Sequence, residues 1–487
     1  MAIKSIAEDP KYKGVLPPDF LHGYASAAYQ IEGAASEGGR GPCIFDVSLK
    51  DFPDTGEVAC KSYHMWRDDV ELLRQYGARS YRFSISWTRI KPLGGKNDPV
   101  NQEGIDYYNN LVSQIPNHTL NQLSQPSSQI NALLDAGIEP TVTLFHYDVP
   151  QALQERYRGF AAIDPTQLIE DFVDYARICF SAYGDRVKRW LTINEPYIFT
   201  ISMVDHIKDW TNADLIRVGH NSLLTHAYAT DLYRRDFQQS QKGQIGIELN
   251  NEWVEPIDDS PEAIAAANLS RGRTLGWGSQ TTAWDAWGDL FLRFSDEEMK
   301  LLKGSADFFS INHYGTMYAT GKPFKAEDAM GWQTMEEVNK SWEKDGKLIG
   351  KRGENGHPHM VGWGFRNLLI HCWENYAKDL DLPIYIYENG FPVEDEQHMP
   401  LEQILDDKDR QEFYSDYIRG LCDAVLDHGA KIQGYHCWSL LDNLEWVCGY
   451  GPRFGVTYID KENGFKRIPK NSAKSLENIW KHVVSEK

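Results

Sequence analysis

The stretch RWLTINEPY, residues 189–197, joins an apolar run to an abrupt polar end. Its aromatic and β-branched residues favour a strand, whereas Pro196 stops regular backbone hydrogen bonding. Asn194 and Glu195 stand at that junction. Glutamates are mostly exposed in proteins, so one that follows a single strand is ordinarily a solvated loop residue. The significance of Glu195 therefore depends on the rest of the chain.

Seven more runs of this kind occur along the chain. Between them lie amphipathic segments such as 62–77 and 410–429, in which apolar residues recur at helical spacing. A strand followed by a helix, repeated eight times, predicts an α/β fold, namely a single (β/α)8 TIM barrel. The eight predicted strands are FLHGYAS (20–26), SYRFSISW (80–87), PTVTLFH (140–146), RWLTINE (189–195), QIGIELN (244–250), FFSINHY (308–314), PIYIYEN (383–389) and IQGYHCWSLL (432–441).

The length and composition agree with one large domain. A chain of 487 residues could hold two or three domains, but barrels of this class often exceed the usual domain size. No low-complexity linker divides the sequence, so we expect residues 1–487 to form a single domain. The 41% of hydrophobic and 12% of aromatic residues are sufficient for a large core and a lined pocket.

The net charge of the chain limits the kinds of molecule that we expect it to bind. Seventy acidic and 50 basic side chains give a formal net charge of −20, which repels phosphate backbones and anionic lipid surfaces. We therefore expect a neutral small-molecule ligand, with no nucleic-acid or membrane partner. The sequence contains neither an apolar leader nor a long apolar run, so we expect a soluble, cytoplasmic protein. Oligomeric state stays open.

Metal and disulfide chemistry are not indicated. The seven cysteines are scattered and form no CxxC pair, which argues against a disulfide framework or a zinc site. His357 and His359 form an HxH pair in GENGHPHM, but this stretch is rich in glycine and proline and is predicted to be a loop. We expect no metal and no cofactor.

Polar residues follow nearly all of the predicted strands. The carboxyl ends of barrel strands meet at one mouth, so Glu195 and Glu388 are expected to face one ligand. Two facing carboxylates suit hydrolysis at an acetal carbon, where one protonates the leaving oxygen and the other attacks or stabilises the cationic centre. The polar residues at these ends are Gln30, Glu32, Arg82, His146, Asn194, Glu195, Asn312, Tyr314, Glu388, Glu445 and Trp446.

At these residues the chain resembles the β-glucosidase family, family 1 of the glycoside hydrolases, and in particular its intracellular fungal-type members. TINEP (192–196) matches the family's acid/base motif, and YENG (387–390) matches its nucleophile motif. The resemblance runs from about residue 15 to residue 482. Five further motifs match in family order: AAYQIEG (27–33), RFSISWTRI (82–90), FHYDVPQAL (145–153), INHY (311–314) and WSLLDNLEWVCGYGPRFG (438–455).

The resemblance implies a role for each matched residue. Glu388 would be the nucleophile and Glu195 the acid/base, with Arg82, Asn312 and Tyr314 supporting them. Arg82 and Tyr314 would contact Glu388. Trp438 would stack beneath the sugar ring, and Phe454 would close the wall near C6. The residues expected to hydrogen-bond the sugar hydroxyls are Gln30, His146, Asn194, Glu445 and Trp446.

Several positions depart from the family pattern. Tyr387 replaces the usual Thr before the nucleophile, and Tyr147 replaces the usual Trp after the sugar-binding His. The expected aglycone-side Trp is unclear, with only Trp363 on offer. Segments 204–214 and 276–289 differ from the usual loops around the mouth. We expect these changes to affect aglycone preference and the rim more than the chemistry.

The function predicted is that of a retaining β-glycosidase. The most specific form is a β-glucosidase that removes terminal non-reducing β-D-glucosyl residues from cellobiose-like or aryl β-glucosides, as in cellulose degradation. A phosphorylated sugar is disfavoured because Glu445 would repel it. The alternative is a sugar-binding barrel whose catalysis is impaired by the altered rim loops. Glucoside, galactoside and fucoside substrates are not distinguished by the sequence.

One segment interrupts a helical pattern. VSQIPNHTLNQLSQPSSQ, residues 112–129, contains helix-breaking prolines and many polar residues. Without it, GIDYYNNL would join INALLDAGIEP in one amphipathic pattern. Val-Ser and a final Gln can be encoded by the usual ends of a short intron. We interpret 112–129 as an insertion, with a retained intron as the hypothesis and an ordinary surface loop as its alternative.

Overall fold

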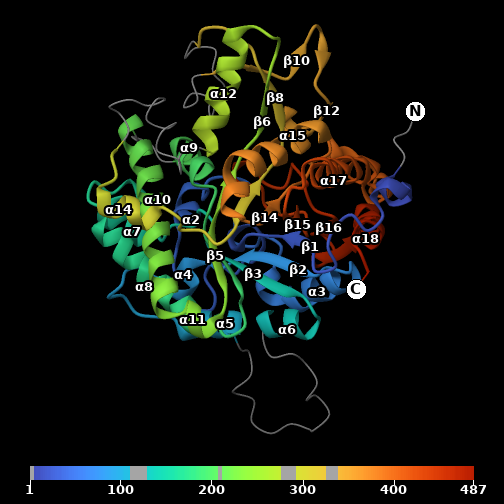
Figure 1. Cartoon of the computed structure of the whole chain (residues 1–487). Helices are drawn as coiled ribbons and strands as arrows, with labels where there is room; N and C mark the ends of the chain where they lie inside the picture. The colour runs from blue at the N-terminus through green and yellow to red at the C-terminus, as the bar shows by residue number, and fades with distance from the viewer. Residues whose placement is uncertain (1–4, 110–128, 207–210, 276–291, 325–337, 487) are drawn as a thin grey trace.

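The chain forms a closed barrel of eight parallel strands, as the sequence predicted (Figure 1). The computed structural model describes residues 5–109, 129–206, 211–275, 292–324 and 338–486. The barrel strands are β1 (Leu21–Ala25), β2 (Ser80–Ser84), β3 (Glu139–Phe145), β4 (Arg189–Asn194), β5 (Gln244–Asn250), β7 (Phe309–Asn312), β14 (Ile384–Glu388) and β15 (Ile432–Trp438).

Each barrel strand pairs with its neighbours in parallel, in the order β1, β15, β14, β7, β5, β4, β3, β2. β1 pairs with β15 as well as with β2, and this pairing of the first barrel strand with the last closes the barrel. The register places Asn194 beside Glu248, and Asn312 beside Glu388. Polar residues from four strands are thus brought to one level at the carboxyl end of the barrel.

Helices surround the barrel, and the longer amphipathic ones such as α3, α8, α17 and α18 bury an apolar face. The predicted helices at 62–77 and 410–429 are confirmed as α3 and α17. The larger helices are α3 (Ser62–Gln75), α5 (Gln102–Asn109), α6 (Gln129–Asp135), α7 (Gln151–Tyr157), α8 (Thr166–Tyr183), α9 (Pro196–His206), α10 (Asn212–Asp236), α12 (Pro261–Leu275), α14 (Asp296–Leu302), α15 (Gly362–Cys372), α17 (Lys408–His428) and α18 (Asn471–Val483); shorter ones are α1 (Ala28–Ile31), α2 (Ile44–Ser48), α4 (Trp87–Ile90), α11 (Gln238–Gln241) and α16 (Leu401–Asp406). No helix in the described ranges is both long and apolar enough to cross a lipid bilayer.

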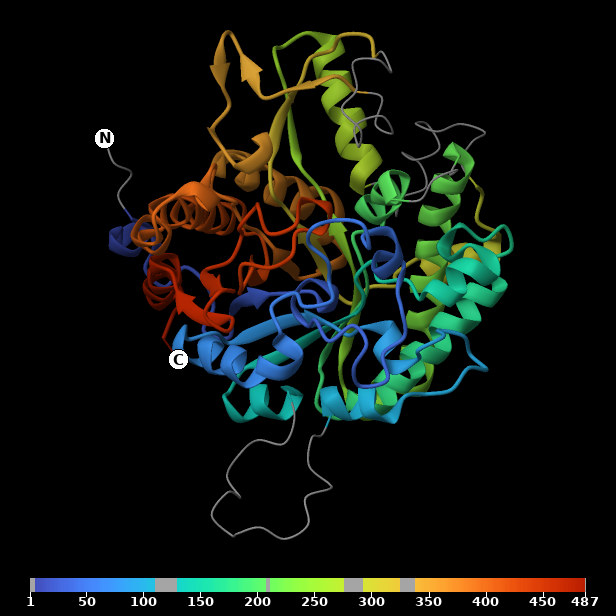
Figure 2. The same ribbon diagram turned by 180° about the vertical axis from the view of Figure 1, so that it is seen from behind.

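Short sheets outside the barrel were not predicted, because strands of two to four residues carry too little pattern. Most of them project with α12 beyond one end of the barrel, as both views show (Figures 1 and 2). They are β6 (Trp253–Pro256), β8 (Thr316–Ala319) and β9 (Lys340–Ser341) in one sheet, β10 (Glu343–Lys344) with β11 (Lys347–Leu348), β12 (Lys351–Arg352) with β13 (His359–Met360), and β16 (Thr457–Asp460) with β17 (Lys466–Pro469).

The segment interpreted as an insertion, 112–129, lies outside the described residues except for its last position. The helices that flank it are described: Tyr108 of α5 and Leu133 of α6 are both buried in the core. The altered segment 276–289 also lies outside the described residues, as does 207–210 within 204–214. The insertion and the retained-intron hypothesis therefore stay predictions.

A buried charge network anchors the loop that follows β15. Lys470 donates to Glu396 Oε1 at 2.8 Å and to Asp442 Oδ1 at 2.9 Å. Arg410 pairs with Glu396 and also donates to the carbonyl of Arg453. Asp442 and Arg453 lie in the loop that carries the predicted sugar-binding residues, so this network fixes the loop from outside the mouth.

Lys470→Met should destabilise the fold, because it leaves the buried Asp442 without its cation and Glu396 with Arg410 alone. The free energy of unfolding is expected to fall by about 3–5 kcal/mol, measured by denaturant titration. Lys474→Met on the same end of α18 is the matched control, since Lys474 is exposed and pairs only with Glu477; it should cost less than about 1 kcal/mol. Equal losses in the two variants would contradict the anchoring role of Lys470.

Candidate active site

The mouth of the barrel holds two adjoining cavities. The inner one has a volume of about 200 Å³, and the outer one about 480 Å³. Glu195, Tyr147 and Phe454 are among the residues that line both. The predicted site residues on the inner wall are Gln30, His146, Glu195, Tyr314, Glu388, Trp438, Glu445, Trp446 and Phe454.

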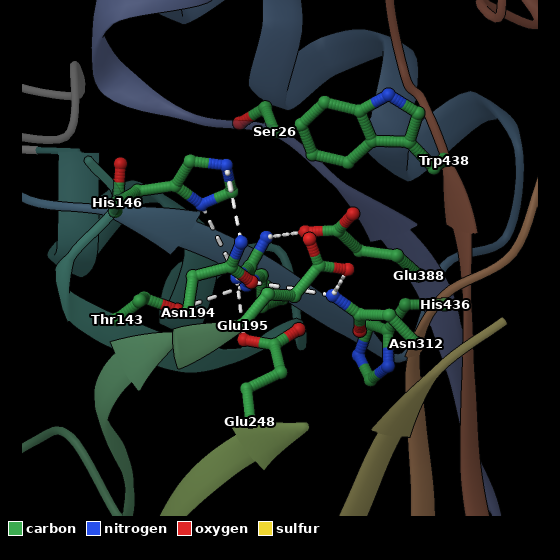
Figure 3. Close-up of polar contacts among 12 residues, drawn as sticks. Ser26, Thr143, His146, Asn194, Glu195, Glu248, Asn312, Glu388, His436 and Trp438 are labelled. Carbon is green, nitrogen blue, oxygen red and sulfur yellow. Dashed lines mark hydrogen bonds and ion pairs between the residues drawn. The ribbon is translucent and has the colours of Figure 1, made fainter. Parts of the chain in front are cut away.

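Arg82 is the central cation of the site, and it is fully buried. Its Nη1 donates to Glu388 Oε1 at 2.6 Å. Its Nη2 donates to Asn194 Oδ1 at 2.7 Å and to Glu248 Oε2 at 2.5 Å, while Nε donates to Thr143 Oγ1 at 2.9 Å. One guanidinium thus links five strands of the barrel. Figure 3 shows Asn194, Glu248 and Glu388 pointing toward one another.

Glu388 ends β14 and is held by two donors. Arg82 contacts Oε1, and the Tyr314 hydroxyl donates to Oε2 at 2.7 Å. Both contacts implied by the resemblance are therefore present. Burial raises the pKa of Glu388, but the charge of Arg82 and the hydroxyl of Tyr314 oppose this rise. Glu388 is the carboxylate with the best support for its ionised form.

Glu195 follows β4 and has no cation in direct contact among the described residues. It accepts hydrogen bonds from the Tyr147 hydroxyl at 2.6 Å and from Asn312 Nδ2 at 2.8 Å. Burial, and then the negative charge of Glu388, raise its pKa to about 8. Glu195 and Tyr147 both have positive φ, +41° and +74°, which costs energy for residues with side chains. The fold holds this pair in a strained arrangement that aims both side chains into the mouth.

The residues expected to bind sugar lie together on the inner wall. The ring of His146 stacks against those of Trp438 and Trp446, with centroids 5.9 and 6.0 Å apart. Burial and the charge of Arg82 lower the pKa of His146, so this ring is neutral. Glu445 accepts long contacts from Gln30 Nε2, at 3.3 Å, and from Trp438 Nε1, at 3.4 Å. These loose contacts leave hydrogen-bonding capacity for a ligand.

Three residues that depart from the family pattern have different surroundings in the structure. The Tyr147 hydroxyl contacts Glu195, which connects this position with the proposed chemistry; our expectation that its change affects aglycone preference more than chemistry stays a prediction. Tyr387 is fully buried and packs on Tyr385 inside the barrel, away from any aglycone. Trp363 is 42% exposed on α15 and is absent from the described lining of both cavities.

Glu248 is a residue of the candidate site that sequence reasoning missed. It lies in β5, is fully buried, and contacts Arg82 directly. The strand QIGIELN was recognised, but we assigned no site residue to it. A lone carboxylate inside a buried parallel strand was the available signal, because such a group is costly without a partner.

The HxH pair does not form a metal site with its neighbours. His357 lines both cavities and lies 3.2 Å from Glu252 Oε1, whereas the ring of His359 stacks on Trp342. Within the described ranges, no group of three or more His, Cys, Asp or Glu side chains is arranged to hold a metal ion. His357 instead lines the two cavities, a position that the prediction of a loop did not include.

Known proteins share this sequence and architecture. Residues 12–125 and 126–484 match the family described as Glycosyl hydrolase family 1. Beta-glucosidase 1B of Phanerodontia chrysosporium is 41% identical over 97% of this chain and 86% of its own length. A GH1 β-glucosidase structure from Humicola insolens in complex with glucose is 37% identical, with a TM-score of 0.86, over 97% of this chain and 99% of that one. The β-glucosidase structure from Trichoderma harzianum is 36% identical, with a TM-score of 0.87 and coverage of 98% and 99%. A match over nearly the whole length establishes that the chain belongs to glycosyl hydrolase family 1.

Proposed function

We propose that the chain hydrolyses terminal β-D-glucosyl residues with retention of configuration, using Glu388 as nucleophile and Glu195 as acid/base. It is a retaining O-glycosyl hydrolase of the β-glucosidase type, and residues 1–487 act as one catalytic domain. The observation that carries the residue assignment is the unequal support of the two carboxylates. Glu388 contacts the buried cation Arg82, whereas Glu195 receives only neutral donors.

The reaction proceeds in two displacements. Glu388 attacks the anomeric carbon while Glu195 gives its proton to the leaving oxygen, which produces a glycosyl ester on Glu388. Glu195, now ionised, takes a proton from water as that water attacks the same carbon. The ester bond breaks, β-glucose leaves, and both carboxyls return to their starting states. The relative from Humicola insolens, which was crystallised with glucose, supports glucose as the released sugar.

The protonation states follow from the same contacts. The active form requires Glu388 ionised and Glu195 protonated, so the pH profile of kcat/KM should be bell-shaped. The acid limb reports Glu388, and the alkaline limb reports Glu195, whose pKa is about 8. The alternative of an impaired sugar-binding barrel is disfavoured because both carboxylates retain oriented donors.

The outer cavity favours an apolar leaving group. Its wall is formed in large part by apolar side chains, including Ile198 and Ile201 of α9, Val254, Pro392 and Val447. Polar side chains such as Asn250, Glu252 and Asn355 also line this cavity, but polar atoms form the smaller part of its surface. A second sugar would need a denser set of hydrogen-bonding groups. Aryl β-glucosides are therefore the preferred substrates, ahead of cellobiose.

Substitution of the two glutamates should separate their roles. Glu388→Ala should abolish turnover, and azide should restore a product of α configuration, because azide enters on the face that the carboxylate occupied. Glu195→Ala should lose cellobiose hydrolysis by about 10²–10⁴-fold but spare aryl glucosides with good leaving groups. With azide this variant should give β-glucosyl azide, identified by proton NMR. Near-native turnover by Glu388→Ala would refute the nucleophile assignment.

Tyr147→Phe should move the alkaline limb of kcat/KM to higher pH. The hydroxyl stabilises ionised Glu195, so its removal raises the pKa of the acid and extends activity by about one pH unit, equivalent to about 1.4 kcal/mol. The acid limb should stay in place. Tyr76→Phe, which removes a buried hydroxyl bonded to Thr457, is the control and should shift neither limb. An unmoved or lowered alkaline limb in Tyr147→Phe would count against the role given to this hydroxyl.

Val447→Ser should weaken aryl glucosides selectively. Val447 is 42% exposed and lines the outer cavity, so its replacement should reduce kcat/KM for an aryl β-glucoside by about fivefold, the value of roughly 1 kcal/mol of apolar contact. Cellobiose should change less. Val58→Ser is matched in exposure, also 42%, at a position that lines neither cavity, and it should have no effect. Equal losses for both substrates would contradict an apolar aglycone site.

A further inference from the structure

The active site contains three buried carboxyl groups and one guanidinium. Glu248 from β5, Glu388 from β14 and Glu195 just after β4 project toward one another (Figure 3). Arg82 forms ion pairs with Glu248 and Glu388. The two-step reaction assigns work to Glu195 and Glu388 only. A third carboxyl at this depth carries a large desolvation cost, so its presence calls for a function.

The three carboxyl groups of this cluster cannot all be ionised at once. One guanidinium neutralises one carboxylate, and each additional buried anion beside it is strongly disfavoured. Glu388 has the stronger claim to the charge, since it receives both Arg82 Nη1 and the Tyr314 hydroxyl. Glu248 receives only Arg82 Nη2, on Oε2, and its Oε1 has no hydrogen-bond partner among the described residues.

We propose that Glu248 is a positioning residue: as an uncharged carboxylic acid it holds the Nη2 edge of Arg82 and leaves the guanidinium charge to Glu388. The proton lies on Oε1, while Oε2 accepts from Arg82. This inference rests on the proposed function, because it takes Glu388 as the nucleophile. Glu248 touches neither cavity and acts on the reaction only through Arg82.

The surroundings of Glu248 agree with a neutral acid. The charged and titratable groups that face it are Arg82 from β2, Glu195 after β4, and Glu388 and Tyr387 from β14. Burial raises the pKa of Glu248 to about 8 in spite of the opposing charge of Arg82, and the charges of Glu388 and Glu195 add to the rise. Burial also raises the pKa of Tyr387, which therefore stays a neutral phenol.

A neutral Glu248 keeps the net charge of the cluster at zero throughout turnover. Before the first displacement the charges are those of Arg82 and ionised Glu388. Afterwards Glu388 is an ester and Glu195, having lost its proton, carries the negative charge instead. The sum is unchanged, so no charge has to enter or leave the buried site. An ionised Glu248 would add an uncompensated anion at every stage.

Two substitutions of similar volume separate positioning from charge. Glu248→Gln keeps an oxygen acceptor for Arg82 without a titratable proton, and should retain kcat and KM within about threefold near neutral pH with an unchanged acid limb. Its alkaline limb should move to lower pH, because Glu248 no longer ionises beside Glu195. Glu248→Met removes the acceptor; kcat should fall about 10–100-fold with little change in KM, and the acid limb should move to higher pH as Arg82 loses its hold on Glu388.

Either of two results would overturn the proposal. One is a Glu248→Met enzyme with wild-type kcat and acid limb; the other is a Glu248→Gln enzyme as impaired as Glu248→Met, which would mean that the negative charge is required. Asp171→Asn is the control, a buried carboxyl of α8 that bonds Tyr157 and lines neither cavity; it should leave kcat and both limbs unchanged.

Infrared difference spectroscopy tests the proton without relying on activity. The spectrum of wild type minus Glu248→Gln at neutral pH should contain the band of a protonated carboxyl, and a carboxylate band in its place would refute the neutral acid. Azide rescue of Glu388→Ala tests the proposed nucleophile independently of the role proposed for Glu248. If rescue yields the α product while both Glu248 variants behave as wild type, only the role of Glu248 fails.

Discussion

A single buried guanidinium is the interaction on which the active site depends. Arg82 lies in β2 and donates hydrogen bonds to Thr143, Asn194, Glu248 and Glu388, which lie on four other strands. Such a cation is stable inside a barrel only when it is neutralised and its donors are used. The carboxyl end of the barrel is therefore arranged around one charge, and the carboxylates that we propose as catalytic acquire their properties from their relation to it.

Two glutamates in one mouth differ because their donors differ. Glu388 contacts the cation, whereas Glu195 contacts a hydroxyl and an amide. In a medium of low dielectric constant this difference is large enough to separate the proposed nucleophile from the proposed acid. The positive φ values of Glu195 and Tyr147 show that the backbone is held in a costly conformation to place both groups. The rigidity of the barrel makes that strain tolerable.

The entrance to the candidate site is formed by parts of the chain outside the barrel strands. The apolar wall of the outer cavity includes α9 and the loop after β15. That loop is tied down by Lys470 and Arg410, which lie outside both cavities. Residues remote from the chemistry thus set the shape of the entrance, because loops without regular hydrogen bonding need side-chain anchors to hold one conformation.

The sequence by itself determined the barrel, since eight β-branched runs alternating with amphipathic segments can bury their apolar faces together in few other ways. It also located Glu195 and Glu388, which stand where strands end. Only the tertiary structure placed the Tyr147 hydroxyl on Glu195 and Glu248 on Arg82. These contacts join residues from different strands, and they depend on register and on charge balance within the closed barrel. Neither quantity is encoded in the pattern of any one segment.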